Sequence, residues 1–121
     1  MSVSDDYRDF VLEQLATAGR LASRRMFGGV GLYLDGLFFA LIDDDTLYFK
    51  TDDSNRERYR QAGSQPFCPY PDRPDYQMGY WAVPAEVLED AEALKAWARE
   101  ALAVALRSKP ARRPARARRP K

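Results

Sequence analysis

The sequence predicts an α+β domain of two layers, in which an antiparallel β-sheet packs against helices from both ends of the chain. Apolar residues recur at helical spacing near each end, and between these regions they alternate with a period of two. Short polar turns separate the alternating runs, which is typical of a β-meander. Strands that follow one another, with helices before and after, favour α+β over an alternating α/β order.

The first helix is expected to begin after Ser4 and to end near Gly19. Ser4 is a suitable N-cap, and the two aspartates that follow it favour the positive end of the helix dipole. The apolar residues at helical spacing are Tyr7, Phe10, Val11 and Leu15.

A run of strands follows, separated by two polar turns. Asp35-Gly36 tolerates the positive φ angles of a tight hairpin, and the three aspartates at 43–45 form the next turn. The expected strands are a short one over 21–27, one over 30–34, a return strand over 37–42 that is apolar on both faces, and one over 46–50.

A short helix and an irregular segment are expected next. Ser54 and Glu57 are spaced as a capping box for a helix that begins within 51–54 and ends at Gly63. Residues 64–75 contain four prolines, which predicts an edge segment around Phe67 to Tyr70 and then a loop.

The last strand and the longest helix complete the fold. The strand is expected over 76–83, ended by Pro84, and Asp90 caps a helix over 91–106. The apolar face of this helix consists of Leu94, Trp97, Ala98, Ala101, Leu102 and Ala105.

The glycine-rich stretch RRMFGGVGLYLDG, residues 24–36, has two possible interpretations. A phosphate-binding loop places its glycines after a strand and at the start of a helix, whereas these glycines precede a hairpin. We therefore expect Gly28 and Gly29 to form a bulge or sharp bend, and Gly31 to leave space for an aromatic ring.

Several segments resemble the TfoX N-terminal domain family, the domain of the TfoX/Sxy competence regulators. They are RRMFGGVGLYLDGLFFALIDDDTLYFKTD, then MGYWAVPAEVLED and LKAWAREAL, with Asn55 and Gly63 between, over about residues 22–106. The structural motif residues are Met26, Phe27, Gly28, Gly29, Gly31, Asp35, Gly36, Gly63, Trp81, Pro84 and Trp97. The resemblance implies a sheet flanked by helices, similar to type III secretion chaperones. It also implies a regulatory or adaptor role in competence gene expression, exerted through protein contacts.

We expect a single-domain member of this family, with the domain in residues 1–106 and a disordered basic tail of Ala, Pro and Arg in 107–121. Of the 19 basic residues, eight lie in the tail, so residues 1–106 carry 11 bases against 18 acids, a net charge of −7. The candidate nucleic-acid contacts are Arg107, Lys109, Arg112, Arg113, Arg116, Arg118, Arg119 and Lys121. Full engagement with duplex DNA predicts a log–log salt slope of about −7. A silent solubilising tail and docking onto the acidic body remain open alternatives.

The residue types present argue against an enzyme. The sequence has no histidine and one cysteine, Cys68, which excludes His-based triads, imidazole-bound zinc and an internal disulfide. We therefore expect no catalytic residue, cofactor or metal ligand. The aspartates at 43–45 lack the spacing of an EF-hand, and Cys68 is interpreted as a bystander thiol.

Two surface features have competing interpretations. The aromatic residues Phe67, Tyr70, Tyr76, Tyr80 and Trp81 could stack bases, but 76–83 has no Lys or Arg, so packing against the last helix is favoured. Five arginines, at 24, 25, 56, 58 and 60, could form a basic patch, but local ion pairs with Asp52, Asp53 and Glu57 are favoured.

The expected partners follow from these interpretations. We expect a protein partner, with the transcription machinery as one candidate, and nucleic acid through the tail as the alternative. No apolar run is long enough to cross a membrane, and the N-terminus lacks the pattern of a signal peptide, so a cytoplasmic location is expected. Both a monomer and a homodimer are compatible with the sequence.

Overall fold

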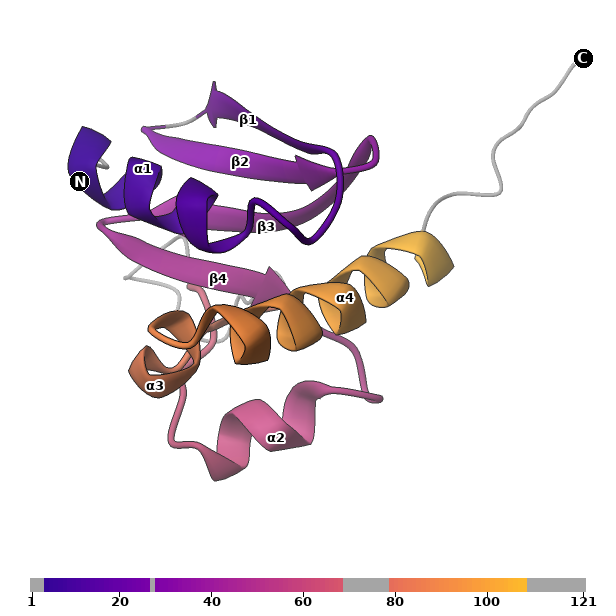
Figure 1. The fold of residues 1–121 in the computed structure, drawn as a ribbon. Helices are drawn as coiled ribbons and strands as arrows, with labels where there is room; N and C mark the ends of the chain where they lie inside the picture. Colours follow the sequence, from indigo (N-terminus) through magenta and orange to yellow (C-terminus); the bar gives the residue numbers. More distant parts are fainter. Residues whose placement is uncertain (1–3, 27, 69–78, 109–121) are drawn as a thin grey trace, which may run out of the picture.

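A computed structural model describes residues 4–26, 28–68 and 79–108, which form an α+β fold with one antiparallel sheet (Figure 1). The strands follow one another in the order β1-β2-β3-β4-β5, so the sheet is a meander, as predicted. The strands are β1 (Leu21–Met26), β2 (Gly29–Leu34), β3 (Leu37–Asp43), β4 (Thr46–Lys50) and β5 (Tyr80–Ala82). The helices are α1 (Asp5–Gln14), α2 (Arg56–Gln61), α3 (Ala85–Leu88) and α4 (Ala91–Arg107).

The two polar turns form where the sequence predicts them. Asp35 and Gly36, between β2 and β3, have φ angles of 51° and 84°, and Asp44 and Asp45, between β3 and β4, both have φ of 53°. Short polar side chains tolerate this left-handed region better than bulky ones. The register between β2 and β3 shifts at Leu32 and Tyr33, which marks a β-bulge.

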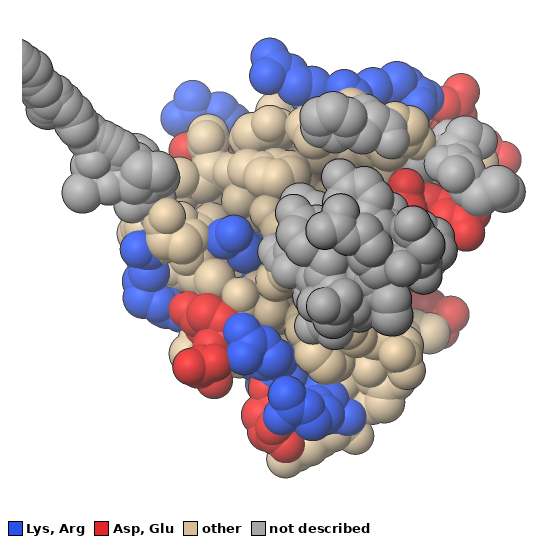
Figure 2. Space-filling view, turned by 180° about the vertical axis from the view of Figure 1, so that it is seen from behind, with Lys and Arg blue, Asp and Glu red and all other residues tan. Residues whose placement is uncertain are grey.

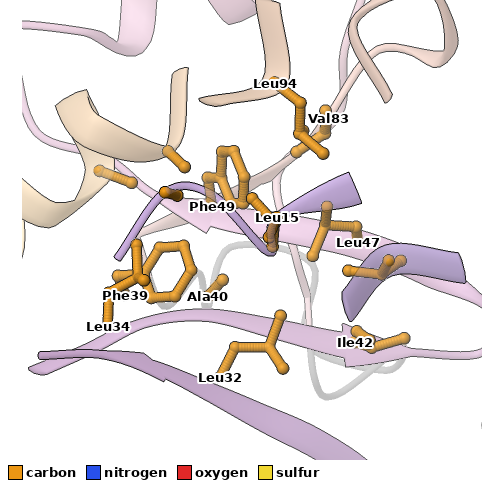
Figure 3. Close-up of a cluster of buried hydrophobic side chains, with 14 of the residues drawn as sticks. Leu15, Leu32, Leu34, Phe39, Ala40, Ile42, Leu47, Phe49, Val83 and Leu94 are labelled. Atoms are coloured by element: carbon orange, nitrogen blue, oxygen red, sulfur yellow. The ribbon is translucent and has the colours of Figure 1, made fainter. Parts of the chain in front are cut away.

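The hydrophobic core lies between the sheet and the two long helices, α1 and α4, which cover the same face of the sheet (Figure 1). Alternation along the strands directs one set of side chains into this core. Figure 3 labels ten residues of the core, of which seven come from the strands and three, Leu15, Val83 and Leu94, from the helices and adjoining segments: Leu15, Leu32, Leu34, Phe39, Ala40, Ile42, Leu47, Phe49, Val83 and Leu94. We call the opposite face of the sheet the rear face.

Helix α1 begins as predicted and ends earlier than predicted. The Ser4 hydroxyl accepts a hydrogen bond from the Tyr7 backbone N–H at 3.2 Å, which confirms the cap. The helix ends at Gln14 rather than near Gly19, because the chain turns at Leu15 and the Ala18 N–H bonds to the Leu15 carbonyl. Phe10, which the helical spacing places on the apolar face, is 40% exposed.

The predicted capping box of α2 is wrong. The N-cap is Asn55, and the Ser54 hydroxyl donates to the Asp52 carboxylate at 2.5 Å instead of capping the helix. Glu57 pairs with Arg60. The predicted end at Gly63 is confirmed, since this residue has a φ of +80° directly after the last helical turn.

The C-terminal elements differ from the prediction in two places. Strand β5 has three residues, and residues 69–78, which include part of the predicted strand, lie outside the described residues. Pro84 does end the strand, and it also begins the short helix α3, which the sequence analysis did not predict. Helix α4 is confirmed, because the Asp90 carboxylate accepts the backbone N–H groups of Glu92 and Ala93.

Candidate functional site

The end of α4 is bound to the loop between β4 and α2. The Arg107 guanidinium donates to the Asp52 carboxylate at 2.9 Å and to the Ser54 hydroxyl at 2.8 Å. Hydrogen bonds from Ser54, followed by those of Arg107, lower the pKa of Asp52 from 3.8 to about 2. The cluster of Asp52, Ser54 and Arg107 therefore holds the point from which the basic segment continues, and we call it the tail anchor.

The tail anchor changes the role of one predicted residue. Arg107 was grouped with the tail, but it is the last residue of α4 and is occupied by an ion pair. The other candidate nucleic-acid contacts, Lys109, Arg112, Arg113, Arg116, Arg118, Arg119 and Lys121, lie outside the described residues.

A second cluster joins α2 to α4. The Tyr59 ring meets the Trp97 ring edge to face, with 4.8 Å between centroids. The Arg58 guanidinium lies 4.7 Å from the centre of the Trp97 ring and pairs with Glu100 at 2.5 Å. Tyr59 is fully buried and its hydroxyl has no hydrogen-bond partner among the described residues. Burial raises the pKa of this phenol far above its usual value.

The glycine-rich stretch performs the structural role that the sequence predicts. Gly28 lies in the bend between β1 and β2 with a φ of +81°, as predicted, whereas Gly29 is already the first residue of β2 and pairs with Met26. A Cβ atom built on Gly31 would lie 2.6 Å from the Met26 methyl and 2.9 Å from the Phe38 ring, so the expected aromatic neighbour of Gly31 is Phe38. Phe27 lies outside the described residues.

The aromatic residues divide between the two faces of the sheet. Trp81 joins the core on the helix side, as predicted, with the Arg60 guanidinium 5.9 Å from its ring centre. Tyr80 points the other way because neighbours in a strand alternate, so its predicted packing against α4 is wrong. It meets Phe38 on the rear face, at 5.8 Å between ring centres.

In the view of the rear face in Figure 2, the visible side chains are mainly uncharged between a row of basic side chains at the upper margin and a group of acidic and basic side chains at the lower left. Phe67 packs on Tyr48 there, with 4.9 Å between ring centres, so its predicted packing against α4 is also wrong. The Lys50 ammonium lies 5.1 Å from the Tyr80 ring centre. Burial raises the pKa of Tyr80 to about 12. Tyr80 is 4% exposed, so its ring is a packing element and offers little surface for base stacking. Tyr70 and Tyr76 lie outside the described residues.

The five arginines of the suggested basic patch are not brought together. Arg24 and Arg25 lie on β1, at one side of the sheet, whereas Arg56, Arg58 and Arg60 lie on α2, which contacts β5 at the other side. The expected local ion pairs form: Arg56 pairs with Asp53 in the loop before α2, and Arg60 pairs with Glu57 within the helix.

The remaining candidates lie apart from one another. Asp45 accepts the Ser4 backbone N–H at 2.8 Å in the turn after β3, and Cys68 is half-buried beyond β4. Among residues 4–26, 28–68 and 79–108, no three histidine, cysteine or carboxylate side chains gather as a metal site would require. In the same ranges, no helix has both the length and the apolar character needed to cross a bilayer.

Neither the tail anchor nor the unpaired Tyr59 hydroxyl follows from the sequence. Asp52 and Arg107 lie 55 positions apart in the sequence. No local pattern therefore indicates that the two side chains form an ion pair. The burial of Tyr59 could have been expected from the sequence, because Tyr59 is the aromatic residue in an otherwise polar six-residue helix.

The chain matches a known protein family. The family model described as the TfoX N-terminal domain matches residues 13–105, which include all of the sheet, most of α4 and only the end of α1. No curated protein matches the chain.

Proposed function

Because the chain belongs to the TfoX N-terminal domain family, we propose that it is a non-enzymatic regulatory or adaptor domain that acts through contacts with another protein. The family match over residues 13–105 is the observation that carries this proposal. By likeness to the TfoX/Sxy regulators, the process would be competence gene expression, the partner a component of the transcription machinery, and the location the cytoplasm.

The chemistry of the described residues supports an adaptor. Five groups have clearly shifted pKa values, and each shift has a structural cause. Burial raises the pKa values of Tyr7, Tyr48, Tyr59 and Tyr80, and hydrogen bonds from Ser54 and then Arg107 lower the pKa of Asp52 at the tail anchor. Catalytic sites usually combine such shifts with a concave pocket and a partner group for proton transfer. These groups instead fasten one element to another.

Affinity capture from cell extract tests the proposal. The bait is the full chain, and the control bait is an unrelated α+β domain of similar size to which residues 109–121 have been joined, so that proteins captured by cationic residues alone are subtracted. Transcription-associated proteins enriched by the full chain over this control are the expected result. If the two baits capture the same proteins, the regulatory proposal is wrong.

A second candidate function is nonspecific nucleic-acid binding through the basic tail. Residues 109–121 carry seven Lys and Arg and no acid, which favours attraction to polyanions without base recognition. Removal of these residues decides between the two functions, because the adaptor proposal assigns recognition to the folded domain.

A further inference from the structure

Strand β1 is an edge strand whose outer side is open. In the described part of the chain it pairs with β2 and with no other strand. Four of its six residues in succession, Ala22 to Arg25, are exposed. An open edge offers unpaired N–H and C=O groups on which another extended chain can add as a further strand.

The opposite edge of the sheet differs, because it is already covered. Pro66 forms a bridge with Trp81 beside β5. The Phe67 N–H donates to the Tyr80 carbonyl at 2.6 Å, and the Ala82 N–H donates to the Gln65 carbonyl at 2.9 Å. A partner strand therefore has one suitable edge among the described strands, and that edge is β1.

The register shows which backbone groups of β1 point outward. Met26 and Gly29 are paired across a two-residue connection, and the residues that flank such a connection form a hydrogen-bonded pair. Because pairs alternate along an antiparallel ladder, Ala22 and Arg24 direct their backbone groups to β2. Ser23 and Arg25 direct theirs to the open side.

The same strand carries positive charge on both sides of the sheet. Arg25 points to the helix side, where its guanidinium pairs with Asp5 at 3.0 Å, and Arg24 points to the rear. Arg24 has no ion pair with a described residue. Figure 2 shows the result as a row of basic side chains along the upper margin, the level at which β1 lies in Figure 1.

We propose that β1 binds an extended acidic segment of a partner protein as an additional strand. The inference rests on the proposed adaptor function and names its docking site. Backbone pairing supplies the attraction that any extended chain would gain, and Arg24 and Arg25 select carboxylates at neighbouring positions of the incoming strand.

Charge repulsion disfavours two other occupants of the β1 edge, namely a second copy of this chain and its own basic segment. A second copy paired through β1 would place its own Arg24 and Arg25 along the same junction, and like charges on adjacent strands are destabilising. Residues 109–121 carry seven cations and no acid, so the same repulsion disfavours them.

The first experiment measures binding of a short synthetic Glu-Val peptide in which pairs of adjacent Glu residues are separated by valines, so that carboxylates face both sides of the sheet. A Lys-Val peptide of the same pattern is the control probe. The full chain is used, and amide hydrogen exchange is followed by NMR. We expect saturable binding of the acidic peptide and slowing of exchange by about tenfold or more at Ser23 and Arg25, whose N–H groups point outward. Unchanged exchange at these amides would overturn the proposal.

Two variants separate backbone pairing from charge. Ser23→Pro removes an outward N–H without removing a bond to β2, and we expect it to weaken peptide binding by about tenfold. Arg24→Glu with Arg25→Glu should reverse the preference toward the Lys-Val peptide. Arg56→Glu with Arg99→Glu is the matched control, with the same charge change far from β1, and should retain the wild-type preference.

Circular dichroism and thermal melting establish that each variant is folded. If Ser23→Pro does not fold, the double arginine variant and the exchange data still decide the outcome. If the Arg56/Arg99 control loses its preference for the acidic peptide as strongly as the β1 variant does, the preference depends on net charge alone. The proposed binding site at β1 would then be wrong.

Capture experiments distinguish failure of the edge site from failure of the adaptor function. If wild type and Ser23→Pro capture the same partners equally well, the partner binds elsewhere and the β1 proposal is wrong while the adaptor proposal stands. If wild type captures no partner above the control bait, the adaptor proposal fails, and the peptide experiment alone decides whether β1 accepts an acidic strand.

Discussion

Two glycines of β2 show how a single missing side chain permits the close approach of neighbouring groups. A Cβ built on Gly29 would lie 2.5 Å from the Ile42 backbone carbonyl oxygen of β3. The corresponding Cβ on Gly31 would meet the end of the Met26 side chain and the Phe38 ring. Backbone in a paired strand cannot move away, whereas the end of a methionine can.

We therefore expect Gly29→Ala to destabilise the domain more than Gly31→Ala. The cost should be about 3 kcal/mol for the first and about 1 kcal/mol for the second, within the usual range for overpacking. Urea unfolding of both variants and wild type measures the difference. Equal costs, or the reverse order, would mean that β2 and β3 separate more readily than the ladder suggests.

The Tyr59 hydroxyl is a polar group buried without a partner among the described residues. Tyr59→Phe removes that hydroxyl and keeps the ring against Trp97, so the free energy of unfolding should stay the same or rise by about 1 kcal/mol. Tyr59→Ala removes the ring as well and should cost about 3–5 kcal/mol. Chemical denaturation checks both, and a loss above about 1 kcal/mol for Tyr59→Phe would show that the hydroxyl is hydrogen-bonded.

Between elements, the tail anchor fastens the end of α4 to the loop that precedes α2. Its stability depends on pH through Asp52, whose pKa is about 2 in the folded protein and 3.8 ordinarily. The folded state thus binds fewer protons than the unfolded state between these values. The contribution of Asp52 is fully present above about pH 4 and is lost as the pH falls toward 2.

Asp52→Asn should lower the melting temperature at pH 6 and reduce its further fall between pH 4 and pH 2. Asp53→Asn is the matched control, because its side chain is 99% exposed and does not contact Arg107. Differential scanning calorimetry across this pH range gives both slopes. Parallel curves for Asp52→Asn and wild type would show that the anchor contributes nothing to folding.

At the scale of the whole molecule, the sequence divides its charge between an acidic part, residues 1–106, and a basic segment, residues 107–121. The sequence predicts a salt slope of about −7 for DNA binding if all eight cations engage. Arg107 is paired with Asp52, however, so seven remain.

The log–log salt dependence of duplex DNA binding should therefore have a slope of about −6. A fluorescence anisotropy titration at several salt concentrations measures it. Truncation after Ser108 should abolish this binding, and Arg107→Ala, which leaves the seven remaining cations, should not change the slope. Binding that survives the truncation would assign the nucleic-acid contact to the folded domain.

Much of the fold was predictable because many of its signals are local. Asp35-Gly36 and the aspartates after β3 favour positive φ wherever they occur, and Ser4 and Asp90 cap helices through N–H groups two or three residues away. The period of two in β2 likewise sorts its side chains by face without reference to any other element. Such features depend only on residues close together in the sequence, so the sequence predicts both the meander and the long C-terminal helix.

The candidate sites were less predictable because they join distant residues. Ser54 had an equally plausible local role as a cap, and it binds Asp52 and Arg107 instead, since the end of α4 lies beside it. Strand order and register determine that Tyr80 lies on the rear face of the sheet and that β1 is an open edge strand. The amino acids alone thus determined the elements and their turns, whereas the folded arrangement decided which side chains meet, because contacts between distant residues depend on how the elements pack.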